Sequence, residues 1–351
     1  MKIPEPRGPL TRTLFSALAC VPGSDEGGAA VEELRLLVTP HVAVSSDIIG
    51  DDDVQLALFC LYELHYSGLE GISDEWEWEP GLIQVRRLME RPFEAALRAA
   101  AASAARDVTL PPAPELTSDA VADLLFGLAA SDTGPSVSRF VAKKATLDQL
   151  KEFLVHKSIY QLKEADPHTW AIPRLSGRPK AALVEIQADE YGGGRPERVH
   201  AAIFAASLRG AGLDDAYGTY VDDVPAITLA SHNMMSMFGL NRRLLGAIVG
   251  HLAAFEMTSS IPNRLYADGL RRLGFGDDVT DYFDEHVEAD AVHEQIAARD
   301  LAGALAEDRP DLLADIMFGA AACLTVDGWV GQHMLDAWSR GESSLRAGAS
   351  S

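Results

Sequence analysis

The chain has 351 residues, of which 52 are acidic and 30 are basic, so its formal net charge is -22. So large a negative charge excludes broad binding to nucleic acid or to an anionic membrane surface, and we expect neither as a partner. The sequence has no apolar run close to the roughly 20 residues that span a bilayer, and no signal segment at its start. We therefore expect a cytoplasmic protein whose cysteines, Cys20, Cys60 and Cys323, are packed thiols.

Apolar residues recur at helical spacing through the first third of the chain, in segments 31–40, 52–68 and 81–100. No stretch there alternates as a half-buried strand would. A segment rich in alanine and proline follows at 99–119, which is typical of a connector. The sequence therefore predicts an N-terminal helical unit over residues 1–115 and a second unit over residues 116–345.

The second unit also has helical periodicity, interrupted by prolines at 167–179 and by three glycines at 192–194. The predicted fold class is all-α, a helical bundle with an additional N-terminal helical unit. The expected helices are 117–130, 133–163, 178–191, 196–210, 225–272 with a break at Pro262, 277–305 and 309–340.

The stretch FDEHVEADAVHEQ, residues 283–295, carries His286, Asp290 and His293 at intervals of four and three. A helix turns about 100° per residue, so the third of these side chains returns to within roughly 20° of the first. All three therefore share one face of a predicted helix. Two histidines and one carboxylate can hold a single non-heme iron, whereas two metal ions need more carboxylates.

Other segments supply further candidate ligands: Glu164, Glu190, His200 and Glu256. Glu256 follows the apolar run LLGAIVGHLAAF, where a charged side chain needs either a metal or a partner such as a nearby arginine. Glu164, in the polar segment KEADPH, could equally be solvated. The sequence leaves both alternatives open.

These residues resemble the pattern of the heme-oxygenase-like diiron oxidases and oxygenases. Members of that family have a Glu and a His in one helical region, then a second Glu, then His-x3-Asp-x2-His. Here Glu190 and Glu256 are 66 positions apart, and Glu256 and His286 are 30 apart. The resemblance covers roughly residues 145–340. It implies a heme-oxygenase-like helical bundle that holds two Fe(II) ions through Glu190, His200, Glu256, His286, Asp290 and His293.

One departure concerns Glu190 and His200, which are ten positions apart with glycines and Pro196 between them. Such a broken helix is similar to the N-oxygenase branch of the family, in which a further upstream Glu can join the ligands, here Glu164. Glu197 is a rival to Glu190, because Glu-x2-His is the spacing of ferritin-like sites. We prefer Glu190, because an acid in the first turn after Pro196 is favoured by the helix dipole alone.

The resemblance implies an oxidoreductase that uses O2 as co-substrate to oxidise a small molecule. We expect an amine or amino acid of specialised metabolism as the substrate, with N-oxygenation, desaturation or C–C cleavage as the reaction. We also expect an external electron donor and a homodimer. The alternatives are a non-catalytic, ferritin-like iron-binding bundle and a thiaminase-like hydrolase, whose nucleophile would have to be Cys323.

Several polar residues outside this pattern have less specific interpretations. His251, five positions before Glu256, should point away from the metal and belong to the core or support a ligand. His168 is expected in a turn, and His232 either lines a substrate cavity or packs in the core. Glu63 and His65 are expected to pack or to contact the other unit.

Overall fold

The computed structural model describes residues 1–346 except 107, 113–115, 132–133 and 135, and leaves the side chains of 288–291 undescribed. Helices and turns account for the secondary structure of the described residues, and none of them lies in a β-strand. The expected all-α fold class is confirmed.

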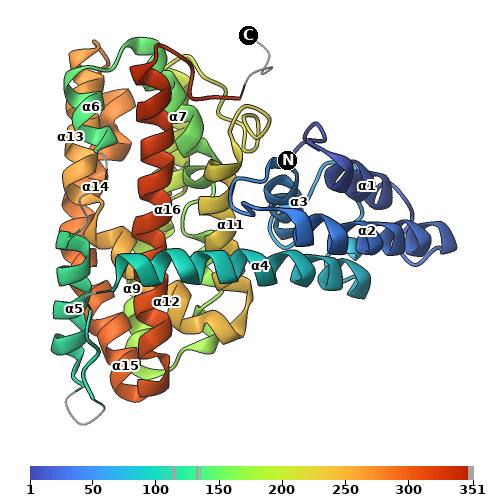
Figure 1. The fold of residues 1–351 in the computed structure, drawn as a ribbon. Coiled ribbons are helices and arrows are strands. Elements are labelled where there is room, and N and C mark those ends of the chain that lie inside the picture. Colours follow the sequence, from blue (N-terminus) through green and yellow to red (C-terminus); the bar gives the residue numbers. More distant parts are fainter. Residues whose placement is uncertain (107, 113–115, 132–133, 135, 347–351) are drawn as a thin grey trace.

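Four helices form the N-terminal part, on one side of the larger bundle (Figure 1). They are α1 (Pro9–Leu18), α2 (Asp25–Val44), α3 (Asp52–Glu63) and α4 (Pro80–Ala104). Helix α1 was not predicted from the sequence. A residue of another helix caps its first turn: the Asp53 carboxylate accepts from the Leu10 amide at 2.7 Å and from the Thr11 amide at 2.9 Å. A carboxylate satisfies the free amides at the start of a helix, so Asp53 fixes α1 against α3.

The larger bundle is formed by the rest of the chain. Its helices are α5 (Ser118–Ser131), α6 (Val137–Lys143), α7 (Leu147–Gln161), α8 (Asp166–Thr169), α9 (Gly177–Glu190), α10 (His200–Gly210), α11 (Ala226–Leu240), α12 (Leu245–Met257), α13 (Ser260–Arg272), α14 (Asp277–Gln295), the π-helix Ile296–Gly303, α15 (Ala304–Asp308) and α16 (Leu313–Ser339). The long helix α4 crosses from the N-terminal helices to α16 (Figure 1).

Helix α12 packs very closely on α16, which fixes the position of Glu256 near the end of α12. A Cβ atom on Gly250 would lie 1.8 Å from the Ile316 carbonyl oxygen, and one on Gly319 would lie 1.9 Å from that of Ala247. Only glycine permits this approach, because both obstacles are backbone atoms. Within the described chain, Pro310–Ser339 is long and apolar enough for a membrane span, but 61% of its most apolar window is buried inside the protein. Its apolarity is accounted for by packing in the core.

Two predicted helices are divided in the structure, and the helix predicted at 196–210 begins only at His200, after a separate 3-10 turn at Pro196–Arg198. The segment predicted at 133–163 breaks before Leu147, where Thr146 and Gln149 form a reciprocal capping box that starts α7. The segment 225–272 breaks after Leu240 and again after Met257, not at Pro262. Pro262 lies in the first turn of α13, where a missing N–H leaves no helical hydrogen bond unmade. The predicted position of that break is wrong.

Apolar residues from both expected units form one continuous core. It extends from Leu10 in α1 to Val326 in α16 and includes Phe59 of α3 together with Met234 and Phe238 of α11. A second core lies wholly in the larger bundle, between α6 and α16. The boundary near residue 115 therefore remains a prediction, and the N-terminal helices share their packing with the bundle.

Candidate metal centre

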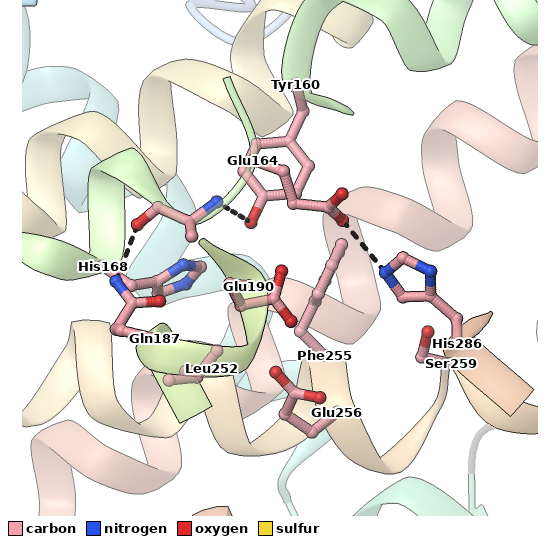
Figure 2. A pocket seen from close by; sticks show the side chains of 11 residues that line it. Tyr160, Glu164, His168, Gln187, Glu190, Leu252, Phe255, Glu256, Ser259 and His286 are labelled. Carbon is pink, nitrogen blue, oxygen red and sulfur yellow. Dashed lines mark hydrogen bonds and ion pairs between the residues drawn. The ribbon is translucent and has the colours of Figure 1, made fainter. Parts of the chain in front are cut away.

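Six of the predicted ligands meet in the bundle, in two groups that share one residue. Each group places one possible ligand atom per residue within 4.8 Å of the others: Glu164, Glu190, His200 and His286 in the first group, and Glu190, Glu256 and His293 in the second. All six side chains are buried. Figure 2 shows the carboxylates of Glu164, Glu190 and Glu256 turned toward one cavity, with the His286 ring at its edge. The side chain of Asp290, the seventh predicted ligand, lies outside the described residues.

A glycine turn brings Glu190 and His200 together. Glu190 is the last residue of α9 and His200 the first of α10, as the predicted helix break requires. Gly192, Gly193 and Gly194 between them all have positive φ, and a Cβ on Gly192 would lie 2.6 Å from the Arg198 carbonyl carbon. The chain therefore folds back, and His200 Nδ1 lies 3.0 Å from Glu190 Oε2. The rival Glu197 is exposed and belongs to neither group.

Tyr282, one helical turn before His286 on α14, orients two ligands of the first group, Glu164 and His286. The Nδ1–H of His286 donates to the Tyr282 carbonyl at 2.7 Å, which leaves the lone pair on Nε2, 3.5 Å from Glu164 Oε1. The Tyr282 hydroxyl lies 2.7 and 2.8 Å from the two Glu164 oxygens and donates to that carboxylate. Burial and the neighbouring Glu164 raise the pKa of Tyr282 well above its usual value, so the hydroxyl remains a donor.

Asp189 orients the second group in a similar way. His293 donates its Nε2–H to Asp189 Oδ2 at 3.1 Å, and its Nδ1 faces Glu256 Oε2 at 3.7 Å and Glu190 Oε1 at 4.0 Å. A carboxylate on the far ring nitrogen is the usual support of a metal-binding histidine, because it fixes the tautomer and raises the basicity of the other nitrogen.

The electrostatics of the cluster favour a cation. Burial raises the pKa of the Glu256 carboxyl, with repulsion from Glu190 adding to it and the hydrogen bond from His293 opposing it. Burial alone would lower the pKa of His293, but Glu256, Asp189 and Glu190 together raise it to about 9. The site therefore already gathers one positive charge, the His293 proton, among its carboxylates.

The ligand atoms also fit metal geometry. Bonds of about 2.1 Å to imidazole or carboxylate place two ligands of one ion roughly 3.0 to 4.2 Å apart. Four of the histidine–carboxylate pairs in the two groups have nitrogen–oxygen separations of 3.0, 3.5, 3.7 and 4.0 Å. Three carboxylates with three imidazoles are a donor set for iron, manganese or zinc. The residues present could therefore hold a metal ion in each group, and Glu190 belongs to both groups.

A small cavity adjoins the carboxylates, with room for about one water molecule. Its other walls are Tyr160, Ala165, His168, Gln187, Leu252, Phe255, Ser259 and His286. His168 is therefore more than a turn residue: it is buried in the short helix α8, and its Nε2 lies 3.2 Å from Nδ1 of His251. His232 packs in the core against Phe59 and Tyr160 and does not line this cavity.

Asp189 and Tyr282 were not identified from the sequence. Their signals are local: Asp189 directly precedes Glu190, and Tyr282 lies one helical turn before His286, on the same face of α14. An acid or a tyrosine at such positions is common on any helix, so only the hydrogen bonds distinguish these two.

The comparisons with known proteins agree with this donor set. The sequence profile of the family described as iron-containing redox enzyme matches residues 151–328, which span α7 to α16 and include all six gathered ligands. None of the curated proteins matches the chain. The match covers just over half of the chain and contains the buried carboxylates and imidazoles that could hold a metal ion, so the chain belongs to the family of iron-containing redox enzymes.

Proposed function

We propose that the protein is a non-heme diiron oxidoreductase that uses O2 to oxidise a small molecule. The observation that carries this proposal is the shared Glu190, which belongs to both groups of candidate ligands and so could bridge two ions. Fe(II) ions held by both groups would supply the two electrons that the reduction of O2 to the peroxide level requires. Glu164, Glu190 and Glu256 would neutralise their charge, while Tyr282 and Asp189 would hold His286 and His293 in the tautomers that bind metal.

The first prediction concerns stoichiometry: the reduced, metal-free protein should take up close to two Fe(II) per chain. Two separable groups of buried ligands are the reason. Anaerobic titration with ferrous iron, followed by metal analysis after desalting, measures the number. A ceiling of one under saturating iron would instead favour a mononuclear site and contradict the diiron proposal.

The second prediction concerns pH. A metal ion must displace the proton of His293, whose pKa is about 9, so the affinity for Mn²⁺ should rise from pH 6.5 to 9 and then level off. The expected slope is about tenfold per pH unit for each proton released. The raised pKa stabilises the metal-free protein below pH 6.5, and this contribution is lost as the pH rises through 9. The difference in Tm between loaded and metal-free protein should therefore widen over that range.

His293→Gln is the control for this pH dependence, because it removes the titrating group and retains a polar side chain. The residual affinity of this variant for Mn²⁺ should rise less steeply with pH, because no proton is displaced from residue 293. A wild-type affinity that does not change between pH 6.5 and 9 would show that His293 carries no proton that the metal displaces.

We propose an amine or amino acid of specialised metabolism as the substrate, as in the N-oxygenase branch, with an external electron donor. The support is the broken Glu190–His200 segment and the position of Glu164 in the first group. Stopped-flow exposure of the Fe(II)-loaded protein to O2, with candidate amines and acids added in turn, tests this: a substrate should change the decay of the optical signal. A homodimer in the cytoplasm remains a prediction.

The ferritin-like alternative would bind iron and consume O2 without coupling it to an organic substrate. Product analysis in the same experiment separates the two. The thiaminase-like alternative has less support, because Cys323 is buried on α16 and does not line the cavity.

A further inference from the structure

A buried ion pair joins the N-terminal helices to the residue that precedes Glu164. The Lys163 ammonium forms an ion pair with Glu63, the last residue of α3, and both side chains are buried. The same Glu63 oxygen accepts a hydrogen bond of 2.8 Å from the Tyr217 hydroxyl. The Lys163 ammonium also lies 3.8 Å from the ring centre of Tyr66. Lysine is rarely buried without such partners, so this contact fixes the side chain firmly.

Lys163 and Glu164 are consecutive, yet their side chains contact opposite parts of the protein. Lys163 reaches the N-terminal helices, whereas Glu164 contacts Tyr282 and His286 of α14. A shift of the backbone at Lys163 must therefore shift the Glu164 carboxylate as well. At this point a residue that contacts the N-terminal helices and a candidate metal ligand are separated by one peptide bond.

The next residue, Ala165, shows that this turn is held under strain. Its φ of 74° is the only positive value among the described residues other than glycine. Such a conformation persists only where its surroundings impose it. The Ala165 amide donates to the Tyr160 hydroxyl at 3.3 Å, and its carbonyl accepts from Gln187 Nε2 at 3.0 Å. Those bonds hold one side of Glu164, and the Glu63–Lys163 pair holds the other.

We propose that the Glu63–Lys163 ion pair is a positioning device through which the N-terminal helices hold Glu164 in the metal centre. The inference deepens the proposed function and rests on it, because it assumes that Glu164 binds a metal ion. Buried ion pairs add little net stability after desolvation, but they fix geometry. The N-terminal helices would thus complete the first group of ligands without contacting the metal or the substrate.

The test compares Glu63→Gln with Glu90→Gln. Glu90 is an equally buried carboxylate of α4, and it accepts from Tyr62 Oη and Asn241 Nδ2, each at 3.1 Å. It therefore also joins the N-terminal helices to the bundle, but it makes no contact with Lys163, Glu164 or Ala165. Both variants should lower Tm. Tyr217→Phe is a milder variant that removes only the hydrogen bond to Glu63 and keeps the ring beside Lys163.

In the metal-free protein, Glu63→Gln should speed hydrogen exchange at the amides of Ala165 and Asp166 at least tenfold more than Glu90→Gln does. In anaerobic Fe(II) titrations, Glu63→Gln should weaken the binding of one of the two Fe(II) ions at least tenfold. The affinity for the other ion should stay within threefold of the wild-type value. Tyr217→Phe should produce the same pattern, with changes in exchange rate and Fe(II) affinity of only a few-fold. If Glu63→Gln does not fold, Tyr217→Phe carries the test.

Unchanged exchange at Ala165 in both Glu63→Gln and Tyr217→Phe would overturn the inference, as would an equal loss of iron in Glu90→Gln. The exchange measurement needs no metal, so it distinguishes this failure from failure of the proposed function. A wild-type protein that takes up no second iron contradicts the diiron proposal, whatever the exchange rates show.

Discussion

Glu190→Ala should reduce iron uptake from close to two ions per chain to one or fewer and abolish most O2 reactivity. Among the residues that the structure describes, Glu190 alone belongs to both groups of candidate ligands. Its two oxygens face different histidines: Oε2 lies 3.0 Å from His200 Nδ1, and Oε1 lies 4.0 Å from His293 Nδ1. Removing it takes one ligand from each ion and leaves Glu256 with less negative charge beside it. Ferrous iron titration and the rate of O2 consumption measure the two effects.

Glu197→Ala is the matched control, because Glu197 is the rival at ferritin-like spacing and is exposed. It should leave iron uptake unchanged and alter the free energy of unfolding by no more than about 0.5 kcal/mol, the usual size of the effect at an exposed position without specific contacts. Loss of iron in Glu197→Ala together with retention in Glu190→Ala would reverse the assignment of the ligand. A partial loss of iron uptake in both variants would point to a metal centre that rearranges when metal binds.

Much of this site could be predicted from residue types and their order. The spacing of His286 and His293 places both on one face of α14, and the apolar sequence before Glu256 identifies a buried carboxylate. The identity of the partners could not be predicted in the same way. Glu256 faces His293 at 3.7 Å rather than an arginine, and Glu164 is buried against Tyr282 rather than solvated. Such choices depend on how helices far apart in sequence pack, which helical periodicity does not determine.

The helix boundaries show a similar limit. Thr146 and Gln149 form a capping box that was readable in the sequence, but the surrounding helical pattern obscured it. The break after Leu240 involves a contact that is distant in sequence: Asn241 Nδ2 donates to the Met237 carbonyl at 3.0 Å and to Glu90 Oε1 of α4 at 3.1 Å. The ion pair between Glu63 and Lys163 joins residues 100 positions apart. A single sequence showed only that Glu63 could contact the other unit.

The segment 277–300 should exchange its amide hydrogens much more slowly once Fe(II) is bound. Helix α14 packs through Val279, Tyr282 and Phe283 in its first half, whereas its second half presents His286 and His293 to buried carboxylates. Without metal, repulsion between Glu190 and Glu256 and the desolvation of both make that half costly to keep packed. Metal binding offsets this cost, so local folding and metal uptake are coupled.

At a free metal concentration of 100 times Kd, binding stabilises the bound state by about 2.7 kcal/mol, which corresponds to roughly a hundredfold slower exchange where local opening releases the metal. Hydrogen exchange with mass spectrometry on metal-free and anaerobically loaded protein measures this directly. Amides of α2 are the internal control and should not change, because α2 contributes no candidate ligand. Equal protection of 277–300 in both states would mean that the carboxylates are held in place by packing alone. The Tyr282–Glu164 and His293–Asp189 hydrogen bonds would then be strong enough to preform the site before any metal arrives.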